Sequence, residues 1–338
     1  MIVNSVRRWP LILGLTTSVA ASSCSVISPK ASTLLYAFEG NTHILDLDTG
    51  QSRIAGPDLT PDGWSPSGRW LLMGGRGGIW VSRHDGSDIR EVLHLADYPD
   101  LGIREVAWLS DRIILLVFAP RAEYDPQDPF GWGYLRFLDW KKGELWAEED
   151  DYLRWYILPS PNGEFWIQRT GQGTEIAAMG GKRVPAPHLE QSNFAPGSIS
   201  GIAFSPDGDK LAYIRGPRVW VADVSVNGLI NERLLHEAEI VEEDLRWSPD
   251  GRMLAFQGYD KEQSTSTLRV VDAETGELLS EWPWPSLSAF LLWSPRSDAV
   301  LSESGAPFIM DIATGEIRRP YGEGNYGAFT NQWRLIRK

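Results

Sequence analysis

The chain has 338 residues, of which 42% are hydrophobic and 23% are charged, and its formal net charge is −13 at pH 7. This composition excludes disorder over most of the chain, because it supplies enough apolar surface for a core. The acidic balance argues against a nucleic-acid partner, since phosphate binding needs clustered lysine and arginine. It favours solubility and a basic partner.

The first 24 residues, MIVNSVRRWPLILGLTTSVAASSC, read as an export signal. Arg7 and Arg8 form a positive start, residues 9–15 form a short apolar run, and small residues follow at 19–23. This order is typical of a cleaved signal peptide. The apolar run is too short to span a bilayer, which needs about 20 apolar residues.

Cys24, the single cysteine of the chain, ends this segment. The stretch Ala21-Ser22-Ser23-Cys24 resembles the lipobox of bacterial lipoproteins, with Ala21 where leucine is usual. The resemblance implies that Cys24 is lipidated and becomes the new amino terminus, with residues 25–32 as a short tether. Several acyl chains on one residue would anchor the protein stably to a membrane. The alternative is ordinary signal cleavage after Ala21 or Ser23, which leaves Cys24 without a role.

A repeated pattern follows the tether: an aromatic residue, Ser-Pro-x-Gly or a degenerate form of it, and then an apolar strand. Copies are WSPSGRWLLMGG from Trp64, AWLSDRIILLVF from Ala107, LPSPNGEFWIQR from Leu158, FSPDGDKLAYIR from Phe204, WSPDGRMLAFQG from Trp247 and WSPRSDAVLSES from Trp293. Equivalent positions at 64, 108, 159, 204, 247 and 293 lie 43 to 51 residues apart. A period near 45 with four short strands per unit is the signature of propeller blades.

Each unit carries a second feature further along, a strand that ends in Asp before a Thr-Gly or Asp-Gly turn, as in LRVVDAETGE from Leu268. Such a turn predicts a hairpin. The repeats resemble the WD-repeat-like blades of TolB-type propellers, which also occur in prolyl-oligopeptidase-like proteins. The resemblance covers nearly the whole chain after residue 33. It implies an envelope scaffold, although a fold alone does not determine function.

The ring is expected to close through its two ends. Six repeats account for six blades between about residues 58 and 320, and residues 34–54 read as the second to fourth strands of another blade. Residues 327–335 supply its missing inner strand, which removes the open sheet edges. We therefore predict an all-β chain with one domain, a propeller over residues 33–338 with about seven four-stranded blades. Six or eight blades also fit the sequence.

No catalytic, metal or cofactor site is predicted. The chain lacks Gly-x-Ser-x-Gly, because Ile199 stands at the nucleophile position of the nearest stretch, 197–201. The five histidines, His43, His84, His94, His188 and His236, fall in different units without ligand spacing. Asp46 and Asp48 sit in a turn without the length of an EF-hand loop.

Long insertions at 119–133, 180–197, 257–267 and 282–286 should gather on one face of the ring, opposite the Ser-Pro-Asp-Gly turns. Binding residues usually lie on such loops, and exposed aromatic residues anchor interfaces. The candidate binding residues are Tyr124, Phe130, Trp132, His188, Trp282 and Trp284. Acidic runs at 148–151 and 242–244 fringe this face. The alternative is that Trp282 and Trp284 cover strand ends and that the acidic runs are solvated.

These features together predict an exported, monomeric and non-catalytic propeller, lipid-anchored through Cys24 and facing the periplasm or the cell exterior. It would bind a protein partner in the cell envelope. A second hypothesis is a carbohydrate or small-ligand binder that uses the central channel and the tryptophan-bearing loops. A third is a propeller lyase or glycan hydrolase, which would need paired carboxylates or a histidine cluster at the axis.

Overall fold

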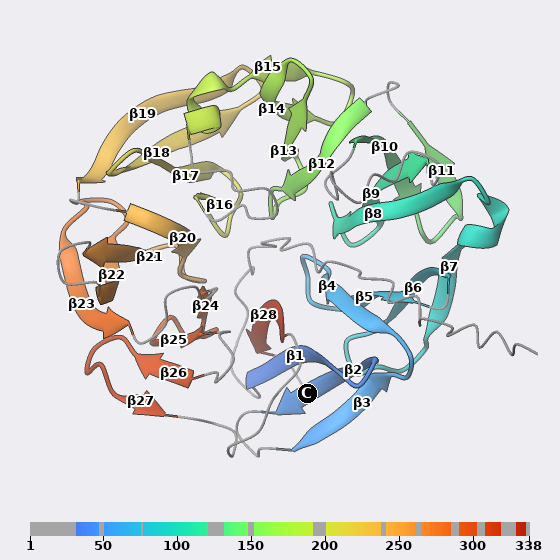
Figure 1. Cartoon of the computed structure of the whole chain (residues 1–338), viewed down its shortest axis with the longest axis horizontal. Helices are drawn as coiled ribbons and strands as arrows, with labels where there is room; N and C mark the ends of the chain where they lie inside the picture. The colour runs from blue at the N-terminus through green and yellow to red at the C-terminus, as the bar shows by residue number, and fades with distance from the viewer. Residues whose placement is uncertain are drawn as a thin grey trace, which may run out of the picture.

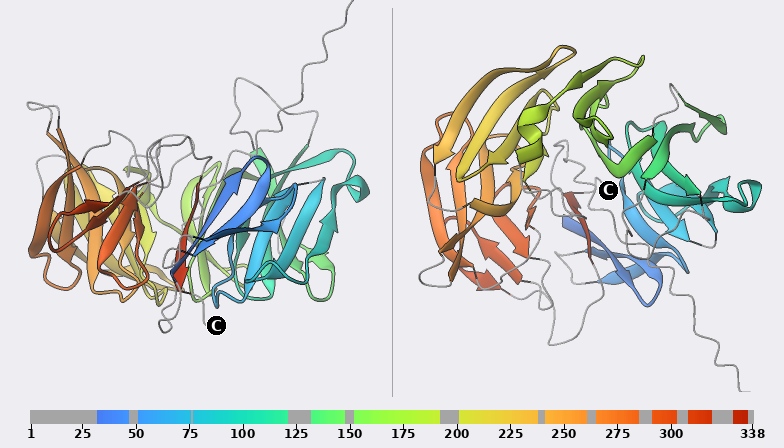
Figure 2. Two further views of the ribbon diagram at one scale, coloured as in Figure 1. Left: turned by 90° about the horizontal axis from the view of Figure 1, so that it is seen from below. Right: turned by 45° about the horizontal axis from the view of Figure 1, so that its top comes forward.

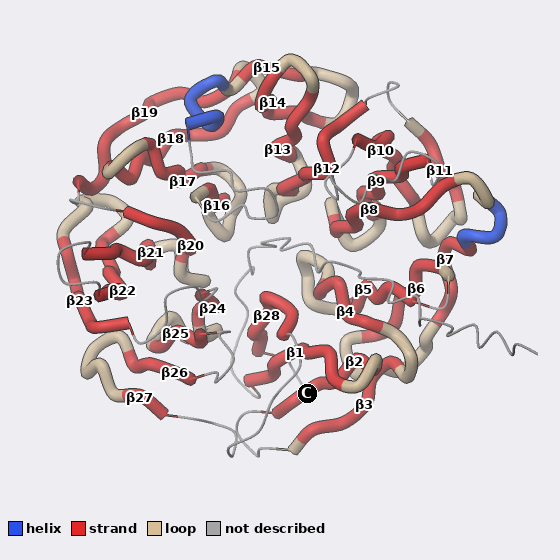
Figure 3. Tube along the Cα trace, viewed as in Figure 1, coloured by secondary structure: helices blue, strands red, loops and turns tan. Residues whose placement is uncertain are grey.

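The computed structural model of the chain describes residues 32–46, 51–75, 77–120, 132–147, 152–191, 201–237, 241–260, 265–284, 291–302, 308–318 and 329–335. These segments form a ring of β-sheets around a central axis (Figure 1). Two short 3-10 helices interrupt the described strands (Figure 3), η1 (Leu95–Asp97) and η3 (Pro187–Gln191). None of the described helices is long and apolar enough to cross a membrane. The predicted signal, Cys24, Tyr124, Phe130 and the acidic run 148–151 lie outside the described residues.

The described strands form seven four-stranded antiparallel blades, as the repeats predict. Blade 1 contains β4 (Thr60–Trp64), β5 (Trp70–Gly75), β6 (Gly78–Arg83) and β7 (Arg90–His94). Blade 2 contains β8 (Leu101–Trp108), β9 (Ile113–Pro120), β10 (Trp132–Asp139) and β11 (Glu144–Trp146). Blade 3 contains β12 (Tyr152–Pro159), β13 (Phe165–Thr170), β14 (Gly173–Ala178) and β15 (Arg183–Pro185).

The same inner-to-outer order continues around the ring. Blade 4 contains β16 (Ile202–Phe204), β17 (Lys210–Arg215), β18 (Arg218–Ser225) and β19 (Gly228–Glu237). Blade 5 contains β20 (Val241–Trp247), β21 (Met253–Asp260), β22 (Thr265–Asp272) and β23 (Leu278–Trp284). Blade 6 contains β24 (Leu291–Trp293), β25 (Ala299–Ser302), β26 (Phe308–Asp311) and β27 (Ile317–Arg318).

Blade 7 joins the two ends of the chain and confirms the predicted closure. It contains β28 (Phe329–Leu335), β1 (Ser32–Phe38), β2 (Asn41–Asp46) and β3 (Ser52–Gly56), in that spatial order. The carboxyl-terminal β28 runs antiparallel to β1, with Ser32 opposite Leu335 and Tyr36 opposite Phe329. The last strand therefore closes the ring by pairing with the first (Figure 1).

The repeated turns follow from local hydrogen bonding. In blade 4, the Ser205 hydroxyl donates to Asp207 Oδ1 at 2.5 Å and accepts the Lys210 N–H at 2.9 Å. Gly208 adopts a φ of 83°, which a side chain would disfavour. Blade 6 lacks this glycine, and Ser297 takes its place with a φ of 60°. The turn geometry is thus kept where the sequence pattern has decayed.

The aromatic residues that end the inner strands tie neighbouring blades together. The indole N–H groups of Trp108, Trp247 and Trp293 donate to the carbonyls of Gly63, Ala203 and Arg246, respectively, in the preceding blade. The bonds measure 3.3, 3.0 and 3.1 Å, and all three are buried. Each accepting carbonyl belongs to the residue just before that blade's own aromatic residue. The aromatic position of the repeat is therefore a contact point between blades.

Blades 2 and 3 depart from the regular pattern, because their strands join into one continuous sheet. The short β11 pairs with Phe137–Asp139 of β10. The other end of β10 pairs instead with the first residues of β12, so that Trp132 lies opposite Arg154. The repeats predict two separate blades here. The three-residue β11 leaves part of β10 free for the next blade.

The connections between strands define two faces of the ring. On the turn face lie the turns between first and second strands and between third and fourth strands. On the loop face lie the turns between second and third strands and the connections between blades. Figure 2 shows the ring from the side, with the strands running between the two faces.

Candidate functional site

Two of the predicted binding residues belong to the packing between blades 5 and 6. Trp284 is only 4% exposed, and its ring centroid lies 4.9 Å from that of Phe308. The Trp282 indole N–H donates to the Ile312 carbonyl at 2.9 Å. A Cβ placed on Gly315 would lie 2.6 Å from the Trp282 ring. Trp284 is therefore a core residue, and Trp282 supports a turn of blade 6. Their contacts fit the alternative interpretation, in which these tryptophans cover strands.

Trp132 opens β10 at the junction of blades 2 and 3. Tyr124 and Phe130 lie outside the described residues, so their part in a binding face stays a prediction. The structure does not bring Trp132 together with Trp282 or Trp284, because these residues belong to blades 2 and 5 of the ring (Figure 1).

His188 is the predicted residue that the structure places at an exposed position. It lies on η3, between blades 3 and 4. Ala186 and Leu189 on either side of it are buried in the core that these two blades share. This packing fixes the helix on the loop face and leaves the His188 side chain at the surface.

His188 meets a cluster of charged and aromatic side chains from blade 4. Its Nδ1 lies 3.3 Å from Arg215 Nη1. The Arg215 guanidinium carbon lies 4.1 Å from the centre of the Trp220 ring, a cation–π contact. Arg215 Nη1 also lies 3.6 Å from Glu232 Oε1. We call His188, Arg215, Trp220 and Glu232, with Tyr213 beneath them, the Arg215 cluster.

Tyr213 forms the floor of the Arg215 cluster. Its side chain is fully buried, and its hydroxyl donates to Glu232 Oε2. Burial, reinforced by the hydrogen bond to Glu232, raises the pKa of Tyr213 above its ordinary value. Tyr213 therefore stays protonated and holds the Glu232 carboxylate in place. The Trp220 indole N–H is buried and donates to no acceptor among the described residues.

The sequence reasoning missed Arg215, Trp220, Glu232 and Tyr213. Three of them lie in one short stretch, YIRGPRVW, in which Gly216 and Pro217 form the turn between β17 and β18. Tyr213 pairs directly with Trp220 across this hairpin. The hairpin pattern could have indicated that these side chains share one face of the blade, since paired residues lie on the same side.

Two buried acids near the axis, Glu105 and Asp244, connect neighbouring blades. Glu105 Oε2 accepts the N–H of Ile157 in the next blade at 3.2 Å, and Asp244 Oδ2 accepts the N–H of Leu291 at 2.5 Å. Both acids stand three residues before the tryptophan that ends their strand. Burial raises the pKa of Glu105 well above its ordinary value, although the bond from Ile157 acts in the opposite direction.

Asp244 also pairs with a buried cation. Arg246 Nη2 lies 2.8 Å from Asp244 Oδ1, and Arg246 Nε reaches the Leu291 carbonyl at 3.4 Å. The two side chains thus hold the N–H and the C=O of one residue in blade 6. Asp244 has a φ of 65°, which is unusual for a residue with a side chain. The Asp244–Arg246 ion pair therefore has a structural role, which is to join two neighbouring inner strands.

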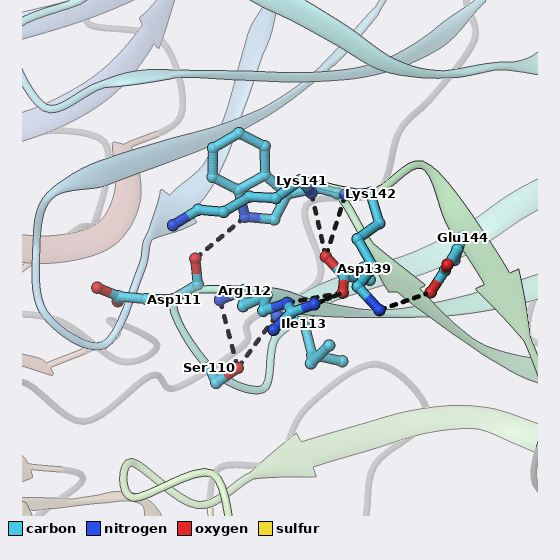
Figure 4. Close-up of polar contacts among 9 residues, drawn as sticks. Ser110, Asp111, Arg112, Ile113, Asp139, Lys141, Lys142 and Glu144 are labelled. Atoms are coloured by element: carbon cyan, nitrogen blue, oxygen red, sulfur yellow. Dashed lines mark hydrogen bonds and ion pairs between the residues drawn. The ribbon is translucent and has the colours of Figure 1, made fainter.

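A second charged cluster lies on the turn face of blade 2 (Figure 4). Arg112 Nε donates to Asp139 Oδ2 at 2.6 Å, and this bond lowers the pKa of the Asp139 carboxyl. Asp139 Oδ1 accepts the main-chain N–H groups of Lys141 and Lys142 at 3.2 and 3.3 Å. Lys142 in turn donates to Glu144. These contacts build the turn between β10 and β11.

The described segments bring together no group of three or more His, Cys, Asp or Glu side chains that could hold a metal ion. The buried acids Glu105 and Asp244 belong to blades 2 and 5 and bind different partners.

Comparison with known proteins supports the fold. No protein-family model matches the chain. The uncharacterized peptidase YuxL of Bacillus subtilis (strain 168) is 28% identical over 114 residues, and the match spans 31% of this chain but only 17% of that protein. An oligogalacturonate lyase in complex with manganese superposes with a TM-score of 0.62 at 15% identity, over 89% of this chain and 87% of that one.

TolB from Acinetobacter baumannii superposes with a TM-score of 0.44 at 14% identity, over 76% of this chain and 63% of that one. At 15% identity, the superposition on the lyase concerns the fold and not the activity. Together with the seven four-stranded blades, it identifies this chain as a seven-bladed β-propeller.

Proposed function

We propose that this chain is an exported, lipid-anchored propeller of the cell envelope that binds a protein partner through its loop face and catalyses no reaction. The observation that carries the proposal is the Arg215 cluster. Its charged and aromatic side chains come from η3, β17, β18 and β19 and hold one another at the surface. A rigid scaffold that presents oriented Arg and aromatic side chains is suited to recognition.

The other charged side chains with defined contacts also support a binding role for the Arg215 cluster, because each of them has a structural task. Glu105, Asp244 and Arg246 bind main-chain groups of the next blade. Asp139 and Arg112 bind the turn of their own blade. These groups are accounted for by the scaffold, whereas His188 is exposed and Nε and Nη2 of Arg215 meet no acceptor among the described residues.

A propeller lyase is the alternative, because an oligogalacturonate lyase superposes over 89% of the chain. An assay with oligogalacturonate, with and without added Mn²⁺, tests it directly. Elimination would create a carbon–carbon double bond that absorbs ultraviolet light. If the Arg215→Gln variant still forms the product, the chain is a lyase whose active site lies away from the Arg215 cluster on the loop face.

Site-specific photo-crosslinking tests the proposed binding face. A photoreactive amino acid replaces Gln172 or His188, which are exposed on the loop face of blades 3 and 4. Matched controls replace Met179 or Val226, which are 43% and 50% exposed on the turn face of the same blades. We expect one specific adduct in intact envelopes from the loop-face positions. Adducts from the turn-face positions alone, or from none of the four, would contradict the proposal.

A further inference from the structure

We propose that Arg215 is the receptor for a single carboxylate, carried by a basic segment of the protein partner. This inference rests on the proposed binding function of the loop face and names the chemistry of its ligand.

The Arg215 guanidinium is held in one orientation before any ligand arrives. It stacks on Trp220 at 4.1 Å, and its side chain is 25% exposed. The turn at Gly216 and Pro217 follows directly, so the backbone at this end of β17 is constrained as well. A planar guanidinium held in this way loses little entropy on binding a carboxylate.

Within the described segments, one nitrogen of Arg215 is engaged and the opposite edge has no partner. Nη1 faces both Glu232 and His188. Nε and Nη2 meet no hydrogen-bond acceptor within the described segments, where Arg215 has these contacts alone. Two parallel N–H groups on one edge match the two oxygens of a carboxylate. The open edge therefore fits a bidentate carboxylate.

Glu232 is not free to close that edge. Its Oε2 accepts the buried Tyr213 hydroxyl, and its Oε1 lies 3.6 Å from Nη1. To reach Nε and Nη2, the Glu232 carboxylate would have to leave Tyr213. The Tyr213 hydroxyl would then be buried without a hydrogen-bond partner, which is costly. Glu232 thus positions Arg215 and leaves its outer edge to a ligand.

His188 supplies a second donor on the Nη1 side of Arg215. Arginine is always protonated and can only donate, so His188 Nδ1 accepts from Nη1. Its proton then resides on Nε2, on the far side of the exposed ring. A ligand carboxylate or a neighbouring carbonyl of the partner can accept this N–H. Arg215 and His188 together would fix the direction from which the partner approaches.

The net charge of the whole chain determines which residues can flank that carboxylate in the partner. With a net charge of −13, the protein repels segments that are acidic throughout. A carboxylate flanked by lysine or arginine avoids this repulsion and still reaches the local positive edge of Arg215. The ligand is therefore an isolated carboxylate in a basic peptide.

Titration with three probes tests this inference. The probes are acetate, a capped Gly-Lys-Asp-Lys-Gly peptide and the same peptide with Asn in place of Asp. Binding is followed on the folded full chain by calorimetry and by the side-chain Nε–H signal of Arg215, which is assigned by its absence in R215Q. We expect the Asp peptide to bind at least about 10-fold more tightly than the Asn peptide and than acetate, in line with a charge-assisted bidentate contact.

Three variants locate the contact. Arg215→Gln should lose at least about 10-fold in affinity for the Asp peptide, and Arg215→Lys, which keeps the charge without the fork, about 3- to 10-fold. Arg218→Gln is the matched control, since Arg218 lies opposite Arg215 across the same turn and pairs with Glu237 at 2.8 Å. It should bind within about twofold of the wild type, because its guanidinium is outside the cluster. Each variant is first checked for an unchanged thermal melt.

Equal binding of the Asp and Asn peptides, or undiminished binding by R215Q, would overturn the inference. Acetate binding as tight as that of the Asp peptide would overturn the peptide source of the carboxylate. Each of these results leaves the proposed function standing if photo-crosslinking from Gln172 or His188 succeeds. Failure of the crosslinking removes the proposed function itself, so the two failures are distinguishable.

Discussion

Asp62 breaks the apolar pattern of the inner strands. It lies two residues before the aromatic residue that ends its strand. The equivalent residues of blades 2 to 6 are Val106, Ile157, Ile202, Leu245 and Leu291, all of them buried. The Oδ2 atom of Asp62 is buried without a hydrogen-bond partner in the described structure. Burial raises the pKa of Asp62 from its ordinary value to about 7.

The raised pKa predicts a loss of stability as the pH rises. Between about pH 4 and pH 7 the unfolded chain has lost the Asp62 proton while the folded chain keeps it, so unfolding becomes easier with increasing pH. Above pH 7 the carboxylate is charged in both states and the full cost of its burial remains. Asp62→Asn has nearly the same shape and cannot ionise. We expect it to exceed the wild type by roughly 2–4 kcal/mol in the free energy of unfolding at pH 8.

Urea unfolding at half-unit steps from pH 5 to pH 9 measures this difference. The gap between Asp62→Asn and the wild type should widen up to about pH 7 and then stay constant. Asp207→Asn, in the turn of blade 4, is a control at an exposed position. A gap that does not change with pH would show that Asp62 is not the titrating group.

The residues of the candidate site could be predicted only in part, because their partners come from distant segments. The sequence pointed to His188 through the insertion that carries it. Arg215 looked like an ordinary strand end, and only the fold brings it to His188, 27 positions away. Trp282 and Trp284 looked like exposed loop residues, because no local pattern indicates that blade 6 would cover them. Local sequence specifies the turns, whereas contacts between blades decide which side chains stay exposed.

At the level of elements, the turn between third and fourth strands is a second contact point between blades. In blade 5, Asp272 Oδ1 accepts the N–H groups of Glu274 and Thr275 at 2.9 and 2.7 Å. These bonds lower the pKa of Asp272. Gly276 completes the turn and packs against β19, where an added Cβ would lie 1.8 Å from the Leu235 carbonyl oxygen. The Asp-x-x-Thr-Gly pattern therefore forms the hairpin, and its glycine allows the close contact with the neighbouring blade.

A pair of glycines separates the cost of backbone conformation from the cost of this contact. Gly40 and Gly276 share a φ of 76°, but an added Cβ on Gly40 would meet nothing within 4 Å. Gly40→Ala should therefore cost about 1 kcal/mol, the usual cost of a left-handed alanine. Gly276→Ala should cost at least about 3 kcal/mol, because blade 5 must also move away from blade 4. Thermal and urea unfolding of the two variants gives the comparison, and equal losses would rule out the contact as the cause.

At the scale of the whole molecule, closure could be predicted because each end of the chain carries an incomplete blade. Residues 34–54 lack an inner strand, and one strand of suitable length remains at the carboxyl end. The union of blades 2 and 3 could not be predicted in this way. It depends on how far the short β11 covers β10, which the repeat pattern does not encode. Repeats therefore predict the number of blades better than the boundaries between them.

Ring closure by β28 makes the stability of all seven blades depend on the last strand. Removing residues 329–338 would leave the edge of β1 unpaired and take away the inner strand between blades 6 and 1. We expect the melting temperature to fall by at least about 10 °C, because losing a whole strand costs several kcal/mol and each kcal/mol shifts the melting temperature by a few degrees. We also expect aggregation through the open edge. A chain that stops after Leu335 keeps β28 whole and is the matched control. Adding a synthetic peptide of residues 329–338 to the truncated protein should restore part of the lost stability by pairing with β1. An unchanged melting temperature of the truncated protein alone would show that the ring is stable without this closure.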